Sequence, residues 1–256
     1  MCLPNSAHRS GSTKIARFAR CVADVEQRIV NEFGGSLNKL VVVLVGDLIE
    51  GSTSQHSALP NDVPVTEQVR IVRRLIVHML GKLAPYADAV LVETVPGNHD
   101  QQRRDRVTPA RDSWAIEACS GAQEVLEVQY DHITWAYPRG SEDVSVAVKV
   151  DDVVIGAVHG DQFSSPDRMR QWWAGQALAG AEVGSAQLLL SGHYHHLRVE
   201  SISKDKTWMQ VPALDNGSPW FKNRKGADAP GGLISLRLEK SAPYWSGLEF
   251  HTGATA

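Results

Sequence analysis

A short apolar segment that ends in Gly-Asp constrains the fold of this chain most strongly. Residues Val41 to Val45 are all aliphatic, and Gly46 and Asp47 follow them directly. An unbroken aliphatic run of this length predicts a strand buried on both faces, as in a parallel sheet covered by helices. Glycine allows a sharp turn at the end of such a strand, where open α/β sheets bind their ligands. Asp47 is therefore a candidate ligand at the carboxyl edge of a sheet.

The same arrangement recurs further along the chain. Apolar residues lead into Asn98, His99 and Asp100, later into His159, and finally into the stretch His193 to His196. Because the carboxyl ends of neighbouring parallel strands meet at one edge of a sheet, these side chains are expected to converge there. Carboxylate and amide oxygens together with imidazoles bind Mn, Fe, Zn or Ni better than Mg. The sequence thus predicts a metal site at this edge.

Length and composition narrow the class of protein. For 256 residues we expect one domain over residues 14–256, preceded by a flexible N-terminal arm over residues 1–13. The formal net charge of -3 argues against a generally basic nucleic-acid binder, although local basic patches stay open. No apolar run has membrane-spanning length and no leader-like segment is evident, so a cytoplasmic protein is expected. The three cysteines share no metal spacing, and the oligomeric state stays unknown.

Helical and strand patterns alternate in the first half of the chain, and hairpins follow in the second. This change predicts a parallel sheet with a second sheet packed on it. Helices are expected at about 12–33, 66–83, 111–120 and 168–179. Strands are expected at 41–45, 89–95, 125–130, 144–150, 153–158, 188–190, 199–203, 207–211, 233–238 and 248–250.

In this order, GD-x-x-E, GNHD, an isolated HGD and GHYH resemble the motifs of the calcineurin-like metallophosphoesterases, and short phage and bacterial members are the most similar. The resemblance covers Gly46 to His196. It implies an α/β fold with two packed β-sheets flanked by helices, a four-layer αββα sandwich. It also implies two divalent metal ions, with Mn expected first and Fe, Zn or Ni as alternatives. One ion would take Asp47, Asn98, His159 and His193 as ligands, and the other would take Asp47 and His195.

The resemblance further implies a mechanism and substrate contacts. A hydroxide held by the two ions would attack phosphorus, and His99 would donate a proton to the leaving oxygen or stabilise the developing charge. Asp100 would orient the His99 ring. Arg103 and Arg104 directly follow the GNHD motif and are candidate phosphate-binding residues, with a solvated loop as the alternative. His196 is a third candidate for substrate binding.

Other positions near the motifs carry further expectations. Glu50 stands where the family more often has Asp, and we expect it to support the turn. Asp161 is a candidate for orienting a metal ligand. The tryptophans Trp172, Trp173 and Trp220 are candidate aromatic surfaces for nucleotide bases, with core packing as the alternative.

One family motif is absent upstream of Asp47. Members usually open with a strand ending in Asp-x-His, and both residues bind the first metal. Only Asn5 and His8 are candidates in that region, so the first strand is expected to be missing and Val41 to Val45 to lie at a sheet edge. Three explanations stay open: the native protein carries the strand upstream, His8 or water completes a weak first site, or catalysis is lost and a metal-binding fold remains.

The leading functional hypothesis is metal-dependent hydrolysis of a phosphodiester, such as nucleic acid or a nucleotide. The enzymatic alternative is a phosphomonoesterase or phosphoprotein phosphatase. The alternative from another class is a non-catalytic metal-binding protein.

Overall fold

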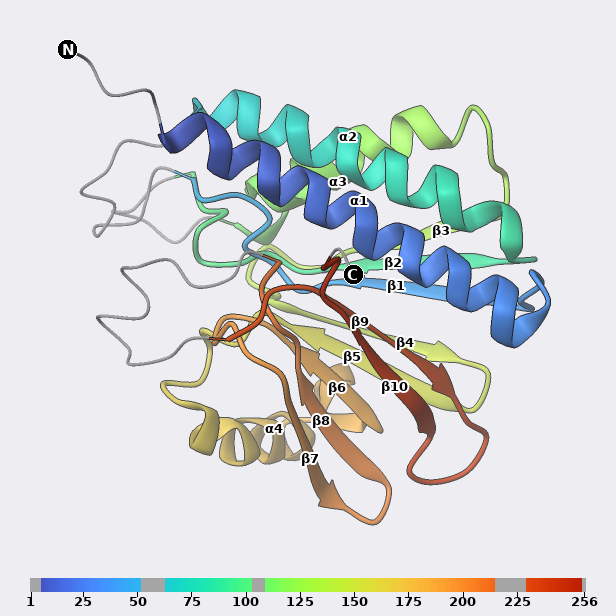
Figure 1. The fold of residues 1–256 in the computed structure, drawn as a ribbon. Coiled ribbons are helices and arrows are strands. Elements are labelled where there is room, and N and C mark those ends of the chain that lie inside the picture. The colour runs from blue at the N-terminus through green and yellow to red at the C-terminus, as the bar shows by residue number, and fades with distance from the viewer. Residues whose placement is uncertain (1–5, 52–62, 103–108, 215–228, 255–256) are drawn as a thin grey trace.

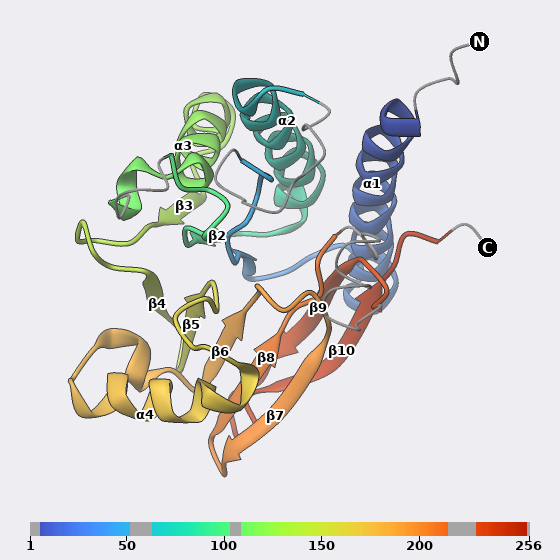
Figure 2. The same ribbon diagram turned by 90° about the vertical axis from the view of Figure 1, so that its left-hand side faces the viewer.

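The structure is a computed structural model that describes residues 6–51, 63–102, 109–214 and 229–254. Two β-sheets lie face to face, with helices over the outer face of each sheet (Figure 1 and Figure 2). Short 3-10 helices interrupt the connections at Ala84–Tyr86, Ala110–Asp112, Pro166–Arg168 and Glu182–Ser185.

The first sheet is parallel and has the strand order β1-β2-β3. Three helices cover its outer face, and aliphatic side chains from all of these elements form one core cluster. The elements of this half are α1 (Ser6–Phe33), β1 (Leu40–Leu44), α2 (Val65–Leu83), β2 (Val90–Thr94), α3 (Trp114–Leu126) and β3 (Ile133–Ala136).

The second sheet is mixed and has the order β4-β5-β6-β8-β7. α4 packs on its outer face through a cluster that includes Trp173 and Trp208. Its inner face packs against the first sheet and against a separate antiparallel hairpin formed by β9 and β10. The elements are β4 (Ser145–Val150), β5 (Val153–Val158), α4 (Met169–Leu178), β6 (Leu188–Ser191), β7 (Arg198–Ser203), β8 (Lys206–Gln210), β9 (Leu233–Leu238) and β10 (Trp245–His251). The expected four-layer αββα architecture is confirmed.

β1 shows how the sequence pattern produces this layering. Leu40, Val42 and Leu44 pack toward the helices, whereas Val41 and Val43 pack toward the second sheet. Alternate side chains of a strand point to opposite faces, so an all-aliphatic strand suits a sheet covered on both sides. Within the described residues β1 pairs with β2 alone, and a helix rather than a strand precedes it. The expectation that this strand lies at a sheet edge is confirmed.

One sequence expectation is wrong, and a helix boundary differs. The helix expected from about residue 12 begins at Ser6, inside the predicted arm over residues 1–13, because extending a helix that packing already stabilises costs little. The strand predicted at 125–130 is the end of α3 and a turn, and the third strand of the sheet is Ile133–Ala136. Leu126 is buried four residues after Ala122, whereas Val128 is 89% exposed, so the apolar residues follow a helical period.

In the parts of the chain that the structure describes, every helix is too short or too polar to cross a membrane.

Candidate metal centre

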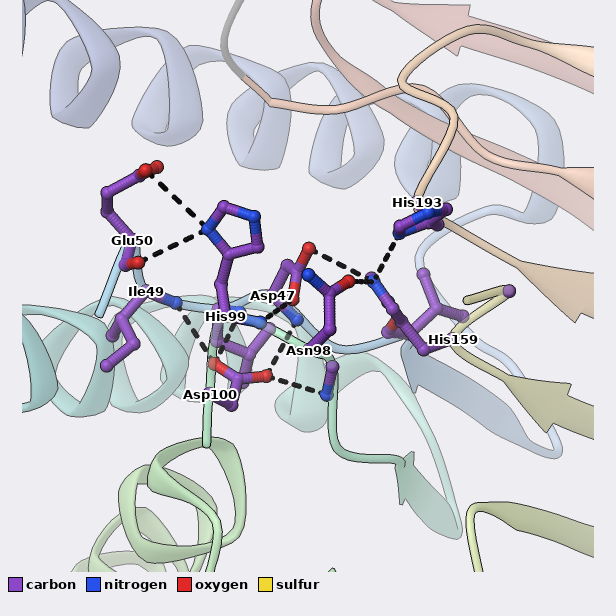
Figure 3. A network of polar contacts seen from close by, with 12 residues as sticks. Asp47, Ile49, Glu50, Asn98, His99, Asp100, His159 and His193 are labelled. Atoms are coloured by element: carbon purple, nitrogen blue, oxygen red, sulfur yellow. Dashed lines mark hydrogen bonds and ion pairs between the residues drawn. The ribbon is translucent and has the colours of Figure 1, made fainter. Parts of the chain in front are cut away.

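Side chains from four loops meet where strands of the two sheets end (Figure 3). Asp47 follows β1, Asn98 follows β2, His159 follows β5 and His193 follows β6. β1 and β2 are parallel neighbours in one sheet, and β5 and β6 are parallel neighbours in the other. Their carboxyl ends therefore bring residues far apart in sequence to one place.

Polar atoms of the other three side chains surround Nε2 of His159. The distances are 3.0 Å to Oδ2 of Asp47, 3.1 Å to Oδ1 of Asn98 and 3.2 Å to Nδ1 of His193. Ligand atoms of Asp47, His159 and His193 all lie within 4.8 Å of one another. The structure thus contains a possible metal site made of one carboxylate, one amide oxygen and two imidazoles.

The hydrogen bonds of His159 support a cation at this position. Its Nδ1 lies 2.6 Å from the carbonyl oxygen of Val45 and must carry a proton there. In the neutral ring, Nε2 is then an unprotonated nitrogen that faces oxygen atoms of Asp47 and Asn98 and the Nδ1 atom of His193. A metal ion satisfies all of these atoms at once, and a carbonyl on the opposite ring nitrogen is the usual support of a histidine ligand.

In the metal-free chain a second proton on His159 takes the place of that cation. Burial disfavours the charged ring, but the hydrogen bond and charge of Asp47 outweigh it and raise the pKa of His159 to about 8. Burial and the neighbouring His159 lower the pKa of His193 to about 4, so its ring stays neutral and can accept a metal.

Glycines let the turns after β1 and β2 approach each other closely. Gly46 has φ 79° and Asp47 has φ 50°, so the chain turns through left-handed backbone directly after β1. A Cβ atom on Gly97 would lie 2.2 Å from both the backbone nitrogen and Oδ1 of Asp47. Only glycine at position 97 therefore leaves room for the Asp47 carboxylate.

Asp100 is fully buried, and its carboxylate accepts hydrogen bonds from four backbone N–H groups. Oδ2 accepts from Asp47 at 2.7 Å and from Gly97 at 2.9 Å, and Oδ1 accepts from Leu48 at 3.0 Å and from Ile49 at 3.3 Å. Burial and the Asp47 charge raise the pKa of Asp100 to about 7, against the effect of these donors. The expectation that Asp100 orients the His99 ring is wrong, because its oxygens hold the turn after β1 instead.

Glu50 is the residue that faces the His99 ring (Figure 3). Nδ1 of His99 lies 3.2 Å from the Glu50 carbonyl oxygen and 3.6 Å from its carboxylate Oε1. The contact with Glu50 raises the pKa of His99 to about 9, and Asp47 adds to this effect despite partial burial. From the sequence, Glu50 is expected only to support the turn. Its place three residues after Asp47 was the available signal for this contact.

The remaining histidines of the GHYHH stretch take different positions. His195 is not part of the group of ligand atoms that converges within the described residues, although its charge contributes to the lowered pKa of His193. Nδ1 of His196 lies 2.7 Å from the carbonyl oxygen of Tyr194, within the same turn. The place of His195 in the ligand set of a second ion therefore stays a prediction.

Other expected site residues divide into three groups. Val45 occupies the Nδ1 side of the His159 ring and the Asp161 charge helps to raise the pKa of His159, so the role of Asp161 in orienting a metal ligand stays a prediction. Trp173 is buried and donates to the Val183 carbonyl, and Trp172 is half-buried against Phe163. The candidate substrate residues Arg103, Arg104 and Trp220 lie outside the described residues.

No family model matches the chain, and no curated protein matches it. Among solved structures it is similar to Vps29 from Entamoeba histolytica complexed with Zn²⁺, at 13% identity over 84% of this chain and 99% of that chain, with a TM-score of 0.39. A predicted phosphoesterase from Streptococcus pneumoniae is 12% identical over 83% of this chain and 88% of that one, with a TM-score of 0.41. Vps29 from Cryptosporidium parvum is 15% identical over 85% and 100%, with a TM-score of 0.37. Similarity at this level assigns neither a family nor an activity to the chain.

Proposed function

We propose that the chain is a metal-dependent phosphoesterase that hydrolyses phosphodiesters, with nucleic acid or a nucleotide as the substrate class. The proposal rests chiefly on one observation, the convergence of Asp47, Asn98 and His193 around Nε2 of His159. The order of the GD, GNHD, HGD and GHYH motifs supports the same reaction class.

The four converging side chains would hold a divalent metal ion. Their mixture of oxygen and imidazole ligands fits Mn, Fe, Zn or Ni, and we propose Mn. Such an ion supplies Lewis acidity and positive charge at a phosphoryl oxygen. A second ion that shares Asp47 and takes His195 is part of the proposal, following the family resemblance.

His99 is the proposed acid of the reaction. Hydrolysis joins a water oxygen to phosphorus, breaks the bond from phosphorus to the leaving oxygen, and requires a proton on that oxygen. In the metal-free chain Glu50 raises the pKa of His99 to about 9, which favours the protonated imidazole as the donor of that proton. Glu50 keeps the ring charged before the reaction, and solvent replaces the proton afterwards.

Hydrolysis of bis-p-nitrophenyl phosphate in the presence of Mn²⁺ tests the proposal. We expect turnover by the unchanged chain and its loss in Asn98→Ala, because that change removes one ligand oxygen. Asn31→Ala is the matched control, since Asn31 is exposed on α1 and its side chain accepts a hydrogen bond from Gln27. Faster hydrolysis of mono-p-nitrophenyl phosphate than of the diester would favour the phosphomonoesterase or phosphoprotein phosphatase instead.

A non-catalytic metal-binding protein is the second candidate. The observation in its favour is that the described residues bring together one set of ligands, which includes Asp47, His159 and His193 and does not include His195. If the chain binds Mn²⁺ and the binding is lost in Asn98→Ala, yet neither ester is hydrolysed, this second candidate is the correct one.

A further inference from the structure

The turn that carries His193 has an unfavourable backbone conformation. His193 has φ 67° and His195 has φ 63°. Residues with a Cβ atom seldom adopt left-handed backbone, and such conformations persist where the surrounding structure holds them in place. Because both residues that flank Tyr194 have this conformation, other contacts are required to fix the turn.

Tyr194 makes the contacts that meet this requirement. Its hydroxyl donates to the carbonyl oxygen of Phe163 at 2.7 Å. Its ring stacks on the Phe163 ring with 6.1 Å between centroids and 19° between planes. Phe163 is 3% exposed and belongs to the core cluster under α4, which includes Trp173 and Trp208. Tyr194 thus connects the turn to a densely packed part of the protein.

Phe163, the partner of Tyr194, lies in a second loop that carries a metal-ligand candidate. Phe163 is in the loop after β5, which begins with His159. The same two loops are joined a second time, by the hydrogen bond from Gly192 N–H to the His159 carbonyl at 2.7 Å. His193 lies between these two connections, with its Nδ1 3.2 Å from Nε2 of His159. The spacing of the two imidazoles is therefore fixed from both sides.

We propose that Tyr194 is a positioning residue of the metal centre, which holds His193 at binding distance from His159 through its hydrogen bond to Phe163. The inference rests on the proposed function, because it assumes that these two imidazoles bind a metal. The Tyr194 ring packs on the Phe163 ring, and the Tyr194 hydroxyl joins the turn to the loop that begins with His159.

Metal affinity of the full chain tests this role, measured by titration with Zn²⁺ in competition with a chelator. Tyr194→Phe keeps the ring and removes the hydroxyl. We expect its dissociation constant for Zn²⁺ to rise about tenfold, which is typical for loss of a group that orients a ligand. The matched control is Tyr86→Phe, which removes a hydroxyl that bonds Glu26 at 3.1 Å between the helices. It is expected to keep the original affinity.

Thermal unfolding of the metal-free proteins separates positioning from general stability. Tyr194→Phe and Tyr86→Phe each lose one hydroxyl contact, so similar small decreases in the unfolding temperature are expected while only Tyr194→Phe loses affinity. Excess metal should restore any phosphodiesterase activity of Tyr194→Phe, because the ligands themselves remain.

Two results would overturn the inference, and they differ from each other. If His193→Ala abolishes Zn²⁺ binding while Tyr194→Phe binds as tightly as the original chain, the positioning role is wrong and the metal site stands. If the original chain and His193→Ala bind Zn²⁺ equally weakly, the metal site itself is wrong, and the role of Tyr194 is rejected with it.

Discussion

Asp47 and Asp100 are neighbouring carboxylates with different surroundings and therefore different roles. One oxygen of Asp47 faces His159 at 3.0 Å, in the group of possible metal ligands. Both oxygens of Asp100 face backbone N–H groups. A carboxylate that accepts such donors stabilises a turn, whereas one that faces imidazoles can bind a cation.

Replacement of Asp100 by asparagine should destabilise the protein strongly. In Asp100→Asn an NH₂ group stands where an oxygen accepted two backbone N–H bonds, so buried donors lose their acceptor. We expect a loss of about 3 kcal/mol in the free energy of unfolding, measured by urea denaturation. Asp131→Asn is the control, because that side chain is fully exposed. Equal stability of the two variants would contradict the role assigned to Asp100.

The charge of Glu50 should be measurable at the His99 ring. Glu50→Gln removes the negative charge beside the imidazole and keeps its carbonyl oxygen. The pKa of His99 should then fall from about 9 toward its ordinary value of 6.5, by about one unit or more. NMR titration of the ring protons in metal-free protein measures this shift. Glu124→Gln, an exposed change on α3, should leave the pKa of His99 where it was; an unchanged value in Glu50→Gln would disprove the contact.

At the scale of elements, the turns after β1 and β2 fit together through glycine. The Gly97→Ala change places a methyl group 2.2 Å from atoms of Asp47, so the two turns must separate. We expect a stability loss of about 2 kcal/mol and loss of Mn²⁺ binding, measured by urea denaturation and by metal titration.

Gly81→Ala is the matched control for this prediction. Gly81 lies within α2, and a Cβ atom there would have open space around it. Alanine favours helix, so this variant should gain about 0.5 to 1 kcal/mol in stability and keep its metal affinity. Equal effects of the two changes would mean that the close approach at Gly97 has no special importance.

At the scale of the whole molecule, the space between the two sheets contains one carboxyl group that stands out. Glu93 lies on β2, two residues after Leu91, and therefore on the same face of the strand. Leu91 packs between the sheets, and Glu93 is fully buried. Neither of its carboxyl oxygens has a hydrogen-bond partner among the described residues. Burial raises the pKa of Glu93 from 4.5 to about 8. The group therefore stays neutral in the folded protein at neutral pH.

This burial makes the stability of the molecule depend on pH. Between pH 4.5 and 8 the unfolded chain releases the Glu93 proton and the folded chain retains it, so stability falls as pH rises and the loss is complete above pH 8. The advantage of Glu93→Gln over the original chain should grow by roughly 4 kcal/mol from pH 5 to pH 8. Urea denaturation at both values measures it. Exposed Glu142→Gln should give no such trend, and a constant advantage for Glu93→Gln would rule out the buried ionisation.

The sequence alone determined the layered architecture and the loops that carry the candidate site. Strand β1 and helix α2 have strong apolar periods, which depend on neighbouring residues only, and their predicted positions agree with the structure within about one residue. Ligand-type residues directly after apolar strands indicated the edge where Asp47, Asn98 and His159 now lie together. Both signals are local in sequence, which explains why they could be interpreted without coordinates.

Tertiary structure decided the partners of those residues. The hydrogen bond from Asp47 N–H to Asp100 joins turns 53 positions apart, and the sequence does not indicate that Asp100 faces backbone N–H groups while Glu50 faces the His99 ring. The apolar residues around Leu126 fit either a strand or a helix, and packing of Ala122 and Leu126 against the core selected the helix. Contacts between distant segments depend on how the sheets and turns pack, so local periodicity cannot specify them.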